Sequence, residues 1–211
     1  GQAVTTEITE VQASTGTSVD LDFGEATNWH SAAQSFTPTY DCTLTEFKHW
    51  LQKYNSPADN VVVEVRPDDT GSPHASTVIG TIATIAGSTI STAPTKTQHS
   101  HTGLSIGLTG GTQYWIVWLR SGSLDDVNLY TLGGNSSGTL VGQLGQWDGA
   151  SAWDFYGATW DVAVDITFVP TPMEVRRHEL VNATLLGQAL AQFSPDVQYD
   201  QNVTTTLQGR A

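Results

Sequence analysis

The segment Asp161-Val162-Ala163-Val164-Asp165-Ile166-Thr167-Phe168 alternates apolar and polar side chains, with the two-residue period of a β-strand that buries one face. The pattern predicts that the core face comprises Val162, Val164, Ile166 and Phe168. The solvent face then comprises Asp161, Ala163, Asp165 and Thr167. A second segment, Gln113-Tyr114-Trp115-Ile116-Val117-Trp118-Leu119-Arg120, is apolar on both faces, so we expect a central strand that is covered on both sides.

Similar short runs fill the chain before these two segments, separated by turn-forming residues such as Asn55-Ser56-Pro57, residues 67–73 and Thr109-Gly110-Gly111-Thr112. The other predicted strands are Val19–Phe23, Ser31–Phe36, Thr43–Lys53, Val61–Arg66, Val78–Ala86, His101–Leu108 and Val127–Leu132. Short strands at fairly even spacing, without a long helical period between them, predict an all-β antiparallel sandwich or barrel. Residues 133–153 contain six glycines and two tryptophans, and we expect a loop or an irregular, exposed edge there.

The ends of the chain differ from this middle part. Residues 1–18 are predicted to form an N-terminal arm, residues 19–168 the sandwich, and residues 169–211 a linker followed by an anchoring or oligomerisation segment. Val169-Pro170-Thr171-Pro172 is a stiff linker, and Met173–Phe193 is the one stretch that favours a helix. Its apolar positions are the candidate assembly residues: Leu180, Leu186, Leu190 and Phe193.

Charge divides along the same boundary. Residues 1–170 hold 17 acidic and 5 basic residues, whereas residues 171–211 hold 4 acidic and 3 basic ones, so the last segment is nearly neutral. It is also too short to form a core by itself, so we expect it to pack on its own domain, on a neighbouring subunit or on another protein, and we expect a homo-oligomer. The net charge of the whole chain, −13, disfavours a nucleic-acid partner because the phosphate backbone is repelled.

Other classes of protein are disfavoured by what the sequence contains. No stretch approaches the roughly 20 apolar residues of a membrane-spanning helix, so we expect no membrane insertion. Cys42 is the one cysteine, which excludes a disulfide within the chain, and we expect a small buried apolar side chain there. No P-loop, His-Glu-x-x-His or Cys-x-x-Cys motif occurs, and carboxylate pairs such as Asp125-Asp126 arise readily in an acidic chain. We therefore predict that the protein is not an enzyme and needs no cofactor.

A metal site is considered and set aside. His99 and His101 would share one face of a strand, and three such pairs around a threefold axis would bind a transition metal. The simpler interpretation, which we prefer, is a solvated strand entry, and no metal site is predicted.

The aromatic residues allow two interpretations. Trp147, Trp153 and Tyr156 lie in or beside the glycine-rich stretch, and Trp50 lies on the polar face of its strand. Flat rings stack on the apolar faces of sugars while neighbouring polar groups bind hydroxyls, so these four residues are glycan-binding candidates. Alternatively, they close the ends of the sandwich. Trp115, Trp118 and Trp160 lie in regular strands and are predicted to be core residues.

A family resemblance adds to this prediction. Its landmarks, in order, are Ala33-Gln34-Ser35-Phe36-Thr37-Pro38, Leu44-Thr45, Asn55-Ser56-Pro57, Val63-Glu64-Val65-Arg66, Gly71-Ser72-Pro73, residues 108–117 and Thr159-Trp160-Asp161-Val162-Ala163. Over residues 20–168 the chain resembles the carbohydrate-binding-module-like jelly-roll β-sandwiches of bacteriophage capsid-decoration and tail-fibre proteins and of secreted bacterial proteins. It departs from them at His49, where an aliphatic residue is common, and at Asp165 if that position faces inward.

The resemblance implies a jelly-roll fold without a catalytic motif. Together with the single cysteine and the C-terminal appendage, it favours a structural protein of a bacteriophage virion, assembled in the host cytoplasm, as a capsid decoration or a head or tail fibre. Its expected partners are other capsid or tail proteins and, where it contacts the host, surface polysaccharide. The alternative is a secreted carbohydrate-binding or adhesion module.

Overall fold

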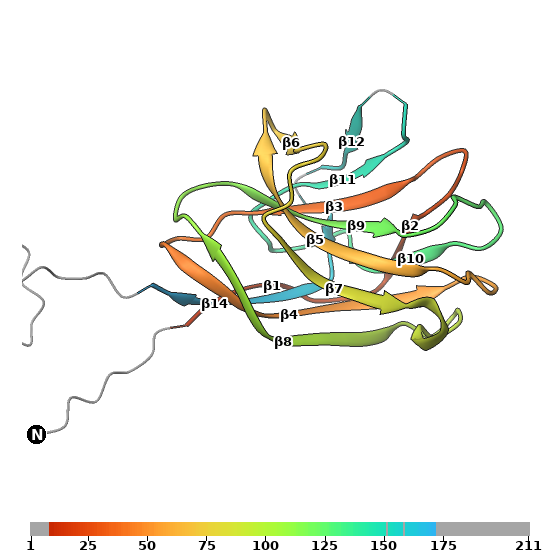
Figure 1. The fold of residues 1–211 in the computed structure, drawn as a ribbon, viewed down its shortest axis with the longest axis horizontal. Helices are drawn as coiled ribbons and strands as arrows, with labels where there is room; N and C mark the ends of the chain where they lie inside the picture. The colour runs from red at the N-terminus through yellow and green to blue at the C-terminus, as the bar shows by residue number, and fades with distance from the viewer. Residues whose placement is uncertain (1–8, 151, 158, 172–211) are drawn as a thin grey trace, which may run out of the picture. The chain divides into compact units, whose positions relative to one another are not determined.

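Two antiparallel β-sheets pack face to face in the computed structural model, which describes residues 9–150, 152–157 and 159–171 (Figure 1). The fold is therefore all-β and of the sandwich type, as the strand spacing predicts. The finer jelly-roll topology implied by the family resemblance stays a prediction. Every predicted strand is present, with shifts of a few residues at some ends.

Sheet A, the lower layer in Figure 1, is organised around strand β4. Strand β8 pairs along one edge of β4, while β14 and then β10 pair along the other edge. Strand β1 continues the sheet beyond β14, and β2 and β13 pair with β10. The members are β1 (Glu10–Ser14), β2 (Val19–Phe23), β4 (Cys42–Lys53), β8 (Thr97–Leu108), β10 (Tyr130–Asn135), β13 (Asp161–Val162) and β14 (Val164–Pro170).

Sheet B, the upper layer, has the order β12-β11-β3-β9-β5, with β7 and β6 both paired to β5. Its members are β3 (Ser31–Phe36), β5 (Asn60–Asp69), β6 (Ser72–Pro73), β7 (Gly80–Ala86), β9 (Tyr114–Arg120), β11 (Leu144–Trp147) and β12 (Trp153–Phe155). Strand β9 is central, and Trp115, Ile116, Val117 and Trp118 are all fully buried. This confirms the prediction that β9 is covered on both faces.

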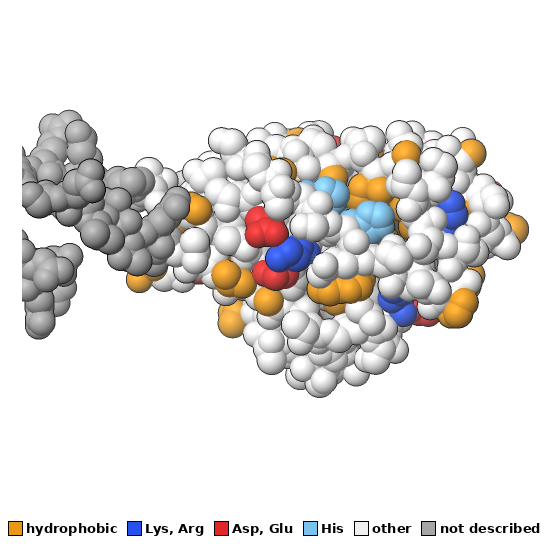
Figure 2. All heavy atoms as spheres, turned by 90° about the horizontal axis from the view of Figure 1, so that it is seen from below, with side chains coloured by type: hydrophobic (Ala, Val, Ile, Leu, Met, Phe, Trp, Pro, Cys, Tyr) orange, Lys and Arg blue, Asp and Glu red, His pale blue; other side chains and the backbone are white. Residues whose placement is uncertain are grey.

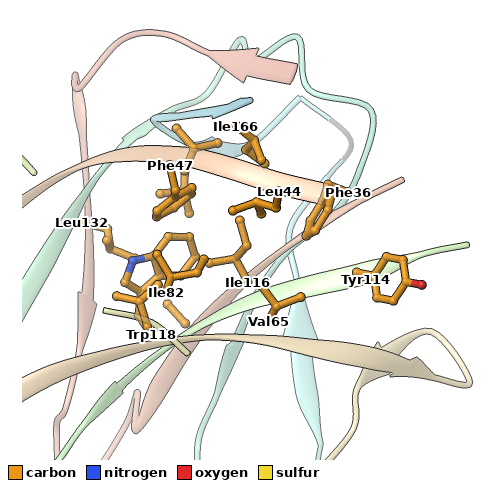
Figure 3. Packing of buried hydrophobic residues seen from close by; sticks show 14 of the residues in the cluster. Phe36, Leu44, Phe47, Val65, Ile82, Tyr114, Ile116, Trp118, Leu132 and Ile166 are labelled. Carbon is orange, nitrogen blue, oxygen red and sulfur yellow. The ribbon is translucent and has the colours of Figure 1, made fainter. Parts of the chain in front are cut away.

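The main core lies between the inner faces of the two sheets (Figure 3). Ile116 and Trp118 of β9 and Val65 of β5 point toward Leu44 and Phe47 of β4. From β14, the predicted inward set of Val164, Ile166 and Phe168 is fully buried. Each aliphatic or aromatic side chain buried in this way stabilises the fold by about 1.5–3 kcal/mol.

Several details of the strand predictions are wrong. Residues 10–14, assigned to an arm, form β1 and pair with β14 in sheet A. Asp161 and Ala163 are buried rather than solvated, because Asp161 accepts the backbone N–H of Leu140 at 2.9 Å and Ala163 donates to the carbonyl of Gly133. Asp165 does not face inward, and it forms an ion pair with Lys48 on the outer face of sheet A.

The glycine-rich stretch is also more regular than expected. Strand β10 continues to Asn135, and residues 144–155 provide both β11 and β12 instead of an exposed loop. Gly134 is buried where β10 pairs with β2 and β13 in sheet A, and Leu144, Gly145 and Gln146 are buried because β11 pairs with β3 and so extends sheet B.

Cys42 is 1% exposed and belongs to the main core, which confirms the prediction of a small buried apolar residue. Burial, reinforced by Glu10 and Asp41, raises the pKa of its thiol to about 11. In the part of the chain that the structure describes, the helical content is the short 3-10 helix η1 (Gly87–Thr89), and no helix there could cross a membrane. The predicted helix at residues 173–193, with its four assembly candidates, lies outside the described residues.

Candidate functional site

A groove lies between two hairpins of sheet B. Both the β5–β6 hairpin and the β11–β12 hairpin rise on the side of sheet B that faces away from sheet A (Figure 1). The hollow between them measures about 440 Å³, within the range of about 300–1,000 Å³ typical of small-ligand sites. We call it the hairpin groove; it is lined by Ser31, Arg66, Asp69, Thr70, Gly71, Ser72, Pro73, Ala75, Leu119, Trp147, Ala152, Trp153 and Phe155.

One wall of the hairpin groove is aromatic. Trp147 of β11 is paired directly with Trp153 of β12, and their rings stack with centroids 6.3 Å apart and planes 23° apart. Trp147 is 36% exposed and Phe155 is 39% exposed, which is unusual for such large apolar side chains. Trp153 is half-buried and packs against a second cluster formed by Ala33, Trp115 and Val117 on the outer face of sheet B. Trp153 is thus held in place by packing, while the rings of Trp147 and Phe155 are open to solvent.

Two glycines allow this wall to form. Gly145 is paired with Phe155, and a Cβ at Gly145 would come within 2.8 Å of the Phe155 ring, so only glycine lets that ring lie across the strand. Gly149, with φ of +82°, brings the hairpin loop onto His30, where a Cβ would overlap the imidazole. His30 in turn packs edge-on against Trp147, with the two ring centroids 5.9 Å apart.

The opposite wall is held by Asp68. Asp68 lies near the end of β5, and its carboxylate accepts the backbone N–H of Gly71 at 3.0 Å, so it holds the turn at Thr70 and Gly71 that joins β5 to β6. The other carboxylate oxygen accepts the Trp115 indole N–H at 2.7 Å. Since the Trp115 ring packs against Phe155 at 5.5 Å, one buried tryptophan connects the turn to the aromatic wall.

The four glycan-binding candidates fall in three places. Trp147 and Trp153 lie together in the hairpin groove. Tyr156 lies apart from it: the ring packs on the main core and on Trp160, and its hydroxyl donates to Gln146. It therefore helps to close the end of the sandwich.

Trp50 lies on the other sheet. Phe47, His49 and Leu51 of β4 point into the core, so the alternation places Trp50 on the outer face of sheet A. Figure 2 shows that side of the molecule, on which charged side chains are few. One group of them consists of a basic side chain between two acidic ones. Lys48, paired with Glu46 and Asp165, forms such a cluster beside Trp50 on this strand face. Trp50 cannot join the aromatic wall.

Sequence reasoning missed the polar side of the groove. Ser31 and Arg66 line it, yet each occurs in an ordinary strand pattern with no local sign of a binding role, and Phe155 of the aromatic wall was missed as well. The turn at residues 67–73 was visible in the sequence, but nothing in the local pattern shows that it stands opposite the β11–β12 hairpin.

A larger hollow of about 640 Å³ lies around residues 120–128, and no aromatic side chain lines it. The carboxylates there serve the fold: Asp125 accepts from Val127 and Asn128, and Asp126 accepts from the backbone of Ala26 and Thr27. These hydrogen bonds lower the pKa of both carboxyl groups, opposite to the raised pKa of a general acid.

The histidine pair belongs to a buried cluster. His99 and His101 face His49, which is fully buried and whose Nδ1 accepts the Trp118 indole N–H at 3.0 Å. The neutral ring therefore carries its proton on Nε2, which donates to Nε2 of His101 at 3.3 Å. With this pattern Nε2 of His49 is not free to ligate a metal, and among the residues described no set of three or more ligand-type side chains is arranged to hold one.

Two comparisons with known proteins found no match. No protein-family model matches the chain, and no curated protein matches it significantly.

Proposed function

We propose that this protein is a non-enzymatic carbohydrate-binding β-sandwich, and that the hairpin groove holds the sugar. The observation that carries the proposal is the stacked pair of Trp147 and Trp153, open to solvent beside Phe155 in a hollow of ligand size. Sugars present apolar C–H faces to such rings and hydroxyls to polar groups around them. The groove offers both, because the turn at residues 69–72 forms its second wall.

The biological setting is part of the same proposal. Following the family resemblance, we place the protein on a bacteriophage particle, as a capsid decoration or a head or tail fibre, with the groove exposed to host-surface polysaccharide. A secreted adhesion module would use the same groove in the same way. Neighbouring genes distinguish the two settings, since capsid and tail genes beside this one favour the virion.

Binding to immobilised host-cell polysaccharide tests the function. Trp147→Ala removes an exposed ring, so it should leave the circular dichroism spectrum unchanged and weaken binding by about tenfold or more, equivalent to roughly 1.4 kcal/mol. Trp50→Ala is the matched control, because it removes a tryptophan from the outer face of the other sheet and should bind as the wild type does. If the wild type binds none of a broad set of bacterial polysaccharides, the proposal is wrong.

A further inference from the structure

A buried hydroxyl without a partner lies in the floor of the hairpin groove. Ser31 opens strand β3 opposite Trp147, on the same outer face as Ala33, and it is 1% exposed. Within the described residues its Oγ makes no hydrogen bond. Buried polar atoms are nearly always paired, because an unpaired one loses its hydration without compensation. Ser31 lines the groove, so a ligand there can supply the missing partner.

The basic side chain in the groove lining, Arg66, already has hydrogen-bond partners within the protein. Arg66 donates through Nε and Nη2 to Glu64, at 3.0 and 2.7 Å. Its Nη1 donates to the carbonyls of His74 and Ala75, at 3.3 and 2.9 Å. Four of the five guanidinium N–H groups are thus engaged, and the fork that would clamp a carboxylate is not available.

The charge that remains in the groove, once Arg66 is paired, disfavours the binding of anions. Glu64 balances Arg66, and Asp69 is the other charged residue in the groove lining. The groove is therefore slightly acidic, in a chain whose net charge is −13. An acidic sugar would meet repulsion here without a compensating cation.

We propose that the hairpin groove selects uncharged sugars, and that Ser31 is a specificity-determining residue whose Oγ bonds a hydroxyl of the sugar stacked on Trp147. This inference rests on the proposed carbohydrate-binding function. A hydroxyl suits the task because it both donates and accepts, as a sugar hydroxyl does.

Ser31→Ala separates this role from a structural one. Removing an unpaired hydroxyl does not destabilise the free protein, so the melting temperature should stay the same or rise. Binding to the preferred oligosaccharide should weaken by about five- to tenfold, as for the loss of one hydrogen bond. The matched control is Ser35→Ala on the same strand face: Ser35 Oγ accepts the N–H of Gln143 at 2.7 Å, outside the groove. This variant should lose melting temperature and keep its affinity.

Calorimetric titration with neutral hexose oligosaccharides, each paired with its uronic acid counterpart, measures the selectivity. We expect a neutral member to bind at least tenfold more tightly than its acidic partner. Unchanged affinity in Ser31→Ala, while Trp147→Ala loses binding, overturns the role of Ser31 and leaves the proposed function intact. A preference for the uronic acids overturns the selectivity. Absence of binding by the wild type to every sugar overturns both the inference and the function beneath it.

Discussion

Trp118 and His49 are joined by a hydrogen bond between the two sheets, in which the indole N–H of Trp118 in sheet B donates to Nδ1 of His49 in sheet A at 3.0 Å. Both side chains are fully buried. His49 also forms a hydrogen bond with His101, which lies at the margin of the core. The resemblance would place an aliphatic residue at position 49. The histidine is accommodated because its two ring nitrogens have one donor and one acceptor as neighbours.

This bond predicts acid sensitivity. Burial lowers the pKa of His49 well below its usual range, and His101 and His99 lower it further. A depressed histidine pKa means that the folded state resists protonation, so stability is fully present above the unfolded pKa of about 6.5 and declines as the pH falls below it. Melting temperature should be level from pH 7.5 to 8.5 and fall steadily below pH 6.5.

His49→Leu should flatten that decline, at a cost at pH 7.5 of about 1–3 kcal/mol for the unpaired Trp118 indole N–H. A wild-type protein equally stable at pH 5 and pH 7.5 would show that the histidine cluster is not held neutral by the fold.

Asp68 supports both walls of the hairpin groove. Asp68→Ala should lower the unfolding free energy by about 1–3 kcal/mol, because the buried Trp115 indole N–H loses its acceptor. Asp69→Ala, one residue along on an exposed position, should change it by no more than about 0.5 kcal/mol. Denaturant unfolding of the two variants measures the difference, and equal losses would refute the role assigned to Asp68.

Cys42 should be unreactive in the folded protein. Its thiol is buried and its pKa is raised to about 11, so little thiolate exists at pH 8. A thiol reagent should label it only on unfolding. Cys42→Ser should cost about 1–3 kcal/mol for a buried unpaired hydroxyl. Rapid labelling of the native protein would mean that the start of β4, where Cys42 lies between β8 and β14, opens readily.

The C-terminal segment can be removed at a defined point. Strand β14 ends at Pro170, and the N–H of Thr171 donates to the carbonyl of Asp41, so truncation after Thr171 leaves every described strand pairing in place. We expect the truncated protein to be a folded monomer. Light scattering should show the full chain to be oligomeric. The same oligomeric state for both would disprove the assembly role predicted for the C-terminal segment, residues 169–211.

Local patterns predict the core better than the groove. The alternation in residues 161–168 and the two-sided apolar run in residues 113–120 identify Ile166, Phe168 and Trp118 as core residues, because burial follows directly from strand periodicity. Strand β1 was missed since its short, polar sequence becomes a strand through pairing with β14. The groove itself was not predicted, although two of its lining residues, Trp147 and Trp153, were named as glycan-binding candidates. Its other wall depends on sheet order, which brings together hairpins that are distant in the sequence.

The most direct test of the central claim is a nuclear magnetic resonance titration that follows the seven tryptophan indole N–H signals as neutral oligosaccharide is added. Sugar stacked in the hairpin groove should shift the signals of Trp147 and Trp153 in a saturable way and leave those of Trp50 and the buried Trp118 in place. Signals that stay fixed across the whole panel of sugars, or a shift confined to Trp50, would contradict the account.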